Sequence, residues 1–206
     1  MSILKQLVFT PKCLICNRLG LEFCPTCIKK IRPFRARDLS EIEECYCAGE
    51  YSDWLRDSII CYKNGDSKYT EFLAQLLLKT IESFIMSQDL TLIPIPSAPQ
   101  KIRQRGFDSI TNLCANIAQE REEIKIDSSK LYLRRTVLDQ VGLTASQRQT
   151  NLAGAFGMHE TINGTVVIVD DVITTGATLN SAARALKYAG AQRIFALALC
   201  GTPRTR

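Results

Sequence analysis

A run of four apolar residues that stops at two carboxylates constrains this fold more than any other stretch of the chain. The run is Val166–Val169, and Asp170 and Asp171 follow it directly. Consecutive apolar, β-branched residues without alternation predict a strand that is buried on both faces. Because a carboxylate is rarely buried without a partner, we expect this strand to end at Asp170.

Small residues follow the two carboxylates and lead into a helical pattern. They are Thr174, Thr175, Gly176, Ala177 and Thr178. Such a loop leaves backbone N–H groups free at a helix N-terminus, where proteins bind phosphate. Ionised carboxylates accept hydrogen bonds from the adjacent hydroxyls of a sugar. The stretch therefore predicts a site for a ribose 5-phosphate, with its hydroxyls on Asp170 and Asp171 and its phosphate on the loop. The loop lacks the Gly-Lys-Ser/Thr of a Walker A motif.

The composition of the chain fits one ordinary domain with a small appendage. The sequence has 206 residues, of which 46% are hydrophobic, enough for a substantial core. Its formal charge of +5 is a mild bias toward polyanions and no nucleic-acid signature by itself. The apolar run in residues 1–9 is too short for a signal peptide, and no apolar run is long enough for a membrane span. We expect a cytoplasmic protein.

Nine cysteines in a cytoplasmic chain favour a metal site over disulfides. Two Cys-x-x-Cys pairs, Cys13/Cys16 and Cys24/Cys27, lie seven residues apart and predict one structural Zn²⁺ held by four thiolates. Two redox-active dithiols are the alternative, which suits pairs this close less well. Cys45 and Cys47 are left open as ligands. Small buried hydrophobic roles are expected for the remaining cysteines, Cys61, Cys114 and Cys200.

A second candidate site follows a short apolar run, residues 90–96, that predicts a strand ending at prolines. Next come Ser97 and three cations, Lys101, Arg103 and Arg105. At the carboxyl end of a central strand they would attract a pyrophosphate, although a solvated basic turn has the same composition. Asp108 or Ser109 is expected to cap a helix over residues 110–118.

The rest of the chain alternates between helical and strand patterns. Residues 67–85 have an apolar helical face, and 177–189 predict a helix that ends at Gly190. Residues 130–134 and 193–199 predict strands, and 135–153 predicts a lid or flexible loop that carries Arg148. His159 is expected at the surface. This alternation indicates an α/β fold with a mostly parallel sheet flanked by helices. We divide the chain into residues 1–47, a zinc-binding four-cysteine module and linker, and residues 48–206.

The phosphate loop resembles the signature loop of type I phosphoribosyltransferases, and nearly the whole chain is similar to the ComF family of competence proteins. The resemblance rests on the cysteine pairs, Ile93-Pro94-Ile95-Pro96, Arg105-Gly106-Phe107-Asp108, Gln140…Leu143…Arg148…Asn151…Phe156, and Val169-Asp170-Asp171-Val172 with Thr174–Thr178. Family members usually have Asn-Gln where this chain has Asp108-Ser109, and many have further Cys-x-x-Cys pairs. This puts the role of position 108 in doubt and suggests a reduced module with one ion.

The resemblance implies binding of phosphoribosyl pyrophosphate (PRPP) together with Mg²⁺. It assigns the 5′-phosphate to Thr174–Thr178, the ribose and any catalysis to Asp170 and Asp171, and the pyrophosphate side to Ser97, Lys101, Arg103 and Arg105. Arg148 would close over the site. In that superfamily a separate hood selects the nucleophile, and residues 1–60 are the remaining candidate for one.

Two functions follow from the resemblance. In the first, the protein binds a phosphoribosyl ligand and takes part in DNA uptake, on single-stranded DNA and with a ComFA-like helicase. In the second, it is an active phosphoribosyltransferase of nucleotide metabolism, with an unidentified acceptor.

Overall fold

The centre of the fold is strand β7 (Thr165–Ile173), which lies between β8 (Arg193–Gly201) and β3 (Leu90–Pro94). The computed structural model describes residues 10–85, 90–134 and 154–203. The sheet has the order β1-β2-β8-β7-β3-β4. All its neighbouring pairs are parallel except β1 with β2. The predicted α/β class with a mostly parallel sheet is confirmed.

The remaining elements connect these strands. The other strands of the sheet are β1 (Phe34–Arg35), β2 (Glu44–Glu50) and β4 (Ile124–Ile126). The helices are α2 (Pro25–Ile28), α3 (Asp53–Lys63), α4 (Lys68–Phe84), α5 (Pro99–Arg105), α6 (Ser109–Glu120) and α8 (Ala177–Tyr188). A separate antiparallel pair consists of β5 (Leu131–Leu133) and β6 (Phe156–Met158). The strand predicted at 130–134 therefore exists but lies outside the main sheet.

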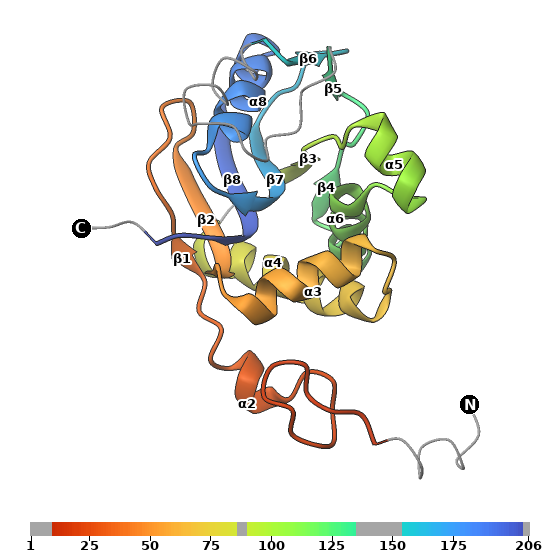
Figure 1. The fold of residues 1–206 in the computed structure, drawn as a ribbon. Coiled ribbons are helices and arrows are strands. Elements are labelled where there is room, and N and C mark those ends of the chain that lie inside the picture. The colour runs from red at the N-terminus through yellow and green to blue at the C-terminus, as the bar shows by residue number, and fades with distance from the viewer. Residues whose placement is uncertain (1–9, 86–89, 135–153, 204–206) are drawn as a thin grey trace.

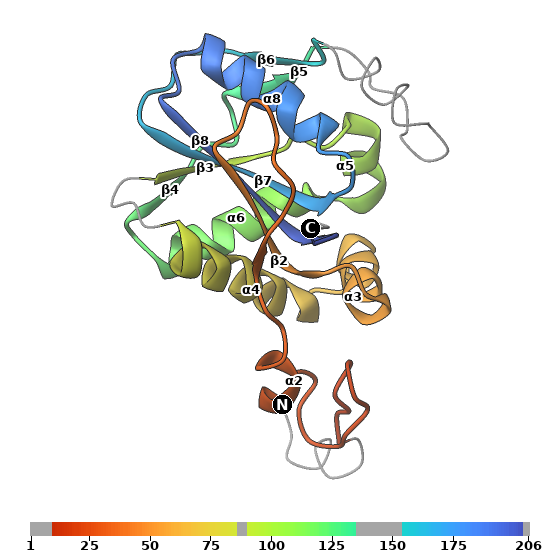
Figure 2. The same ribbon diagram turned by 90° about the vertical axis from the view of Figure 1, so that its left-hand side faces the viewer.

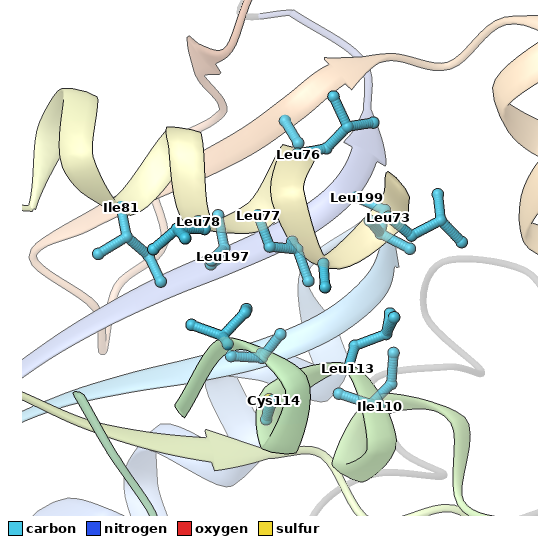
Figure 3. Close-up of a cluster of buried hydrophobic side chains, with 14 of the residues drawn as sticks. Leu73, Leu76, Leu77, Leu78, Ile81, Ile110, Leu113, Cys114, Leu197 and Leu199 are labelled. Carbon is cyan, nitrogen blue, oxygen red and sulfur yellow. The ribbon is translucent and has the colours of Figure 1, made fainter. Parts of the chain in front are cut away.

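Successive side chains of β7 point to opposite faces of the sheet and pack in two different hydrophobic cores. Val167 and Val169 pack in the core beneath α4 and α6, whereas Val166 and Ile168 pack beneath α8. Figure 2 shows α8 on one face of the sheet and α4 with α6 on the other. Figure 3 shows the first core, where leucines of α4 meet α6 and β8. The predicted burial of this strand on both faces is confirmed.

The expectation that the strand ends at Asp170 is wrong. Strand β7 continues to Ile173 because β8 extends equally far, and Asp170 pairs with Ala198 and Val172 with Cys200. Backbone pairing thus continues after the core has ended. The two carboxylates avoid full burial, since both residues are only half-buried at this end of the sheet.

The cysteine pairs form a small module that packs against α4. Phe23 stacks on Phe72 with ring centroids 3.7 Å apart and meets Tyr69 edge-on at 5.7 Å. Figure 1 shows α2 below α3 and α4, away from β5 and β6. Strand β2 crosses the division drawn after residue 47. We therefore propose that the module ends between α2 and β1, before the first paired strand.

Within the described ranges, no helix is both long enough and apolar enough to cross a membrane.

Candidate functional site

The connections of the sheet diverge at β3 and β7. From β3 the chain passes through α6 to β4, and from β7 it passes through α8 to β8 on the opposite side. Open parallel sheets bind ligands at such a switch point, beyond the carboxyl ends of the strands. A pocket of about 340 Å³ lies there. It brings together sequence-predicted residues from three segments, namely Ser97, Lys101, Arg105, Asp170, Asp171 and Thr174–Thr178.

Two predicted residues are not placed in this pocket. Arg103 is exposed on α5 and does not line it. Arg148 lies outside the described residues.

The predicted phosphate loop enters α8 through Gly176. This residue has a φ of +74° and is the N-cap of α8. A Cβ atom at this position would overlap the side chain of Leu39, so glycine is needed both for its conformation and for its small size. The Thr175 hydroxyl accepts a hydrogen bond from the Ala177 N–H at 3.3 Å. The first turn of α8 lines the pocket, so the positive end of its helix dipole faces the cavity.

The two carboxylates lie beside this loop. The Asp171 N–H donates to Asp170 Oδ1 and the Val172 N–H to Asp171 Oδ1, both at 2.8 Å. Burial raises the pKa of Asp170 to about 7, with the positive charge of Lys63 acting in the opposite direction. Asp170 is therefore able to exchange a proton near neutral pH.

Lys63 is a site residue that sequence reasoning missed. It lines the pocket, and its Nζ pairs with Asp171 Oδ2. Burial lowers its pKa to about 8; Asp170 opposes this effect, whereas Arg105 and Lys101 add to it. No local motif marks Lys63, because its place depends on where α3 ends in the fold.

Asp108 connects two segments beside the pocket. Its Oδ1 accepts hydrogen bonds from the Ile110 and Thr111 N–H groups at 3.2 Å, so the predicted N-cap of α6 is confirmed. Its Oδ2 accepts the Ser97 N–H at 3.0 Å. Asp108 therefore joins the loop after β3 to α6. The aspartate that this chain has in place of the usual asparagine thus has a structural role.

The four predicted ligand cysteines converge. The sulfurs of Cys13, Cys16, Cys24 and Cys27 all lie within 4.8 Å of one another. The Cys16 and Cys24 sulfurs are 3.8 Å apart, which is about the tetrahedral edge expected from a Zn–S bond of roughly 2.3 Å. The Cys24 N–H donates to Cys13 Sγ at 3.5 Å. Burial alone would raise the pKa of Cys13, but backbone hydrogen bonds outweigh burial and lower it to about 6. The donor set fits a structural zinc ion.

The other cysteines are placed differently. Cys45 and Cys47 are buried in β2 and pack into the core beneath α8, where burial raises the pKa of both thiols. Among the described residues they belong to no metal-binding cluster. Cys114 and Cys200 are buried as expected, whereas Cys61 is partly exposed. His159 is exposed as expected and stacks on Tyr132.

The described part of the cysteine module does not line the pocket. Within residues 10–62, none lines the cavity, and Lys63 is the first residue that does. One wall instead includes Leu133 of β5 and Phe156 of β6. The expectation that residues 1–60 supply a hood finds no support in the described part of the chain.

Comparisons with known proteins agree with this geometry. Residues 125–206 match a family model described as a phosphoribosyl transferase domain. A DNA utilization protein, YhgH, of Salmonella typhimurium is 32% identical over 202 residues, which cover 91% of this chain and 84% of that protein. The competence protein ComFC of Streptococcus pneumoniae is 24% identical, covering 89% of this chain and 82% of the relative. Competence protein F of Haemophilus influenzae is 29% identical over 130 residues, covering 59% of this chain and 56% of the relative. With its phosphoribosyltransferase domain and likeness to relatives over most of their length, the chain belongs to the ComF family.

Proposed function

We propose that the chain binds PRPP or ribose 5-phosphate in the pocket at the ends of β3 and β7, and that it acts in DNA utilisation during natural competence. One observation supports the ligand above all others. A pair of carboxylates, a loop at a helix N-terminus and several cations line the same cavity. Carboxylates suit sugar hydroxyls, and the loop and cations suit phosphates.

Each group then has a role. The loop Thr174–Thr178 holds the 5′-phosphate, and Asp170 with Asp171 holds the ribose hydroxyls. Ser97, Lys101 and Arg105 lie along the pyrophosphate. For Arg103 and Arg148, a part in pyrophosphate binding remains a prediction.

Mg²⁺ fits this site as an ion carried by the ligand. In the described residues the pocket contains no group of three potential metal ligands. Mg²⁺ usually binds through substrate phosphates and one or two carboxylates, and needs no protein cage. When bound, it would neutralise part of the pyrophosphate charge.

Chemistry at this site would consist mainly of positioning and charge stabilisation. Departure of pyrophosphate from the ribose develops positive charge on the sugar, and the two carboxylates adjoining it favour that charge. The alternative function, phosphoribosyl transfer to an unidentified acceptor, would use the same residues. The wall of Leu133 and Phe156 would then have to contribute to the acceptor site.

The proposed role in DNA handling rests on the relatives. Their names refer to DNA utilization and competence. We propose single-stranded DNA and a ComFA-like helicase as cytoplasmic partners. The cations at the pocket provide a surface that suits nucleic-acid phosphates.

An assay with single-stranded DNA and free bases separates the two functions. Fluorescence anisotropy should detect DNA binding that weakens about twentyfold between roughly 50 and 200 mM salt if three phosphates are contacted. No purine, pyrimidine or orotate should accelerate PRPP breakdown. Turnover with any of these bases would establish the transferase instead, and absence of DNA binding at low salt would contradict the role in DNA handling.

Affinity for PRPP is expected to rise with pH through about 7, the pKa to which burial raises Asp170. The ionised carboxylate accepts hydrogen bonds on both oxygens, whereas protonation removes its charge and turns one oxygen into a donor, so affinity should fall by up to about tenfold per pH unit below that point. Calorimetry across this range measures the effect. In Asp170→Asn the dependence assigned to Asp170 should disappear, leaving the titrations of the ligand phosphates and of Lys63. Identical pH profiles for the two proteins would show that another group is responsible.

A further inference from the structure

Lys63 contributes a charged side chain to the pocket from outside the matched domain of residues 125–206. It is the last residue of α3, it lines the pocket, and its Nζ pairs with Asp171 Oδ2. The two side chains are 23% and 21% exposed, so the pair is largely removed from water. We propose that Lys63 is a counter-ion that distinguishes ligands: it neutralises Asp171 in the free protein and moves to the pyrophosphate when PRPP binds. This inference rests on the proposed function.

The C-terminal end of α3 is held in place by Tyr62, which positions Lys63 at the pocket. The Tyr62 hydroxyl donates to the Ser109 carbonyl at 2.8 Å and lies 2.9 Å from Asn112 Oδ1, and its ring meets Phe107 edge-on. A positive charge at a helix C-terminus is also favoured by the helix dipole. The backbone of Lys63 is thus held against α6, while its flexible four-carbon side chain can still change partner.

The ion pair of Asp171 with Lys63 affects how this carboxylate can bind a ribose hydroxyl. Its Oδ1 already accepts the Val172 N–H, and its Oδ2 faces Lys63. A ribose hydroxyl that donates to Oδ2 therefore shares this oxygen with the ammonium group and weakens the attraction between Asp171 and Lys63. Ribose 5-phosphate does so without offering Lys63 a second anion near the ribose C1.

PRPP offers that anion. Lys101 and Arg105 line the same pocket as Lys63, and their positive charges add to the lowering of its pKa. A pyrophosphate placed among them gives Lys63 a new partner as the ribose takes Asp171. Lys63 should therefore weaken the binding of ribose 5-phosphate and strengthen that of PRPP.

The test compares the two ligands in wild type and in Lys63→Met by calorimetry. We expect PRPP affinity to fall on the order of tenfold or more, as for loss of a hydrogen bond to a charged group, while ribose 5-phosphate binds as tightly as before or more tightly. Lys63→Arg, which keeps the charge, should retain the preference for PRPP. A purely structural role would weaken both ligands in Lys63→Met.

Lys130→Met is a matched control. Lys130 pairs with Asp127 at 3.2 Å, with exposures of 25% and 20%, and does not line the pocket. Its substitution should leave both affinities unchanged. If Lys63→Met does not fold, Lys63→Gln provides the same comparison.

The outcomes separate this inference from the proposed function. If wild type binds neither PRPP nor ribose 5-phosphate, the proposed function fails. If wild type binds both ligands but their affinity ratio is unchanged by loss of the Lys63 charge, the role of Lys63 is refuted and the site itself stands.

Discussion

Replacing Asp170 and Asp171 together by asparagine is expected to abolish PRPP binding. An amide cannot supply the charge or the full acceptor capacity of a carboxylate. A hydrogen bond to a charged group contributes roughly 1.5–3 kcal/mol, so the double substitution should cost on the order of a hundredfold or more in affinity. Calorimetry on the folded variant measures this loss. Unchanged affinity would eliminate the assignment of the ribose to these residues.

The single variant Asp170→Asn adds a stability measurement that separates loss of function from loss of fold. The folded pKa of Asp170, about 7, lies above its usual value of 3.8, so the folded state binds the proton more tightly than the unfolded chain. Stability from this group is complete below about pH 4 and is lost as the pH rises through about 7.

Asparagine at position 170 removes that loss. At pH 8 the variant should be more stable than wild type by about 1 kcal/mol, allowing for partial exposure, and near pH 4 the two should melt alike. Melting curves at both pH values provide the check. A lower melting temperature at pH 8 would mean that the carboxylate supports the fold.

Loss of the zinc ion that we propose for the four-cysteine cluster is the second change with a large expected effect. Residues 10–33 contain few buried apolar side chains apart from the cysteines, so we expect a bound metal to supply most of their folding free energy. Cys24→Ser should bind less than one zinc per chain and expose this module to proteolysis. The sheet should survive, because its cores lie on β7 and β8.

This change should also affect α4. Phe23 covers Phe72 and Tyr69, and an unfolded module would uncover both rings. Limited proteolysis and metal analysis of reduced protein measure the two effects. Cys61→Ser is the control. Because Cys61 lies outside the cluster, this variant should retain a full equivalent of zinc. Wild-type protein that purifies without metal, with the module still protected from proteolysis, would contradict a structural zinc.

Local patterns were sufficient where the chemistry is local. The run Val166–Val169 predicted the central strand, and the loop that follows it predicted the start of α8 at Ala177. The spacing of the cysteine pairs predicted the cluster because each Cys-x-x-Cys brings two sulfurs to one point.

Sequence patterns failed where distant segments decide the structure. Strand β2 contains small and charged residues with weak strand preference, and it forms because β8 provides a parallel partner. The same pairing moves residues 44–47 into the sheet. The end of the central strand likewise depended on the length of β8.

Two site contacts were invisible for the same reason. Lys63 reaches Asp171 across more than a hundred residues of sequence, and Leu39 packs against Gly176 from the segment that precedes β2. Neither residue belongs to a local sequence motif that would mark it as part of a site. Only the packing of α3 on α6, and of residues 36–43 on α8, brings them to the site.

The central claim is that this pocket binds a phosphoribosyl ligand, and a titration of wild-type protein with PRPP and Mg²⁺ tests it most directly. We predict one site per chain in calorimetry, competition by ribose 5-phosphate, and no comparable binding of inorganic pyrophosphate alone. Equal binding of PRPP and pyrophosphate, without competition by ribose 5-phosphate, would contradict the claim, because it would show a cationic patch that does not recognise the sugar.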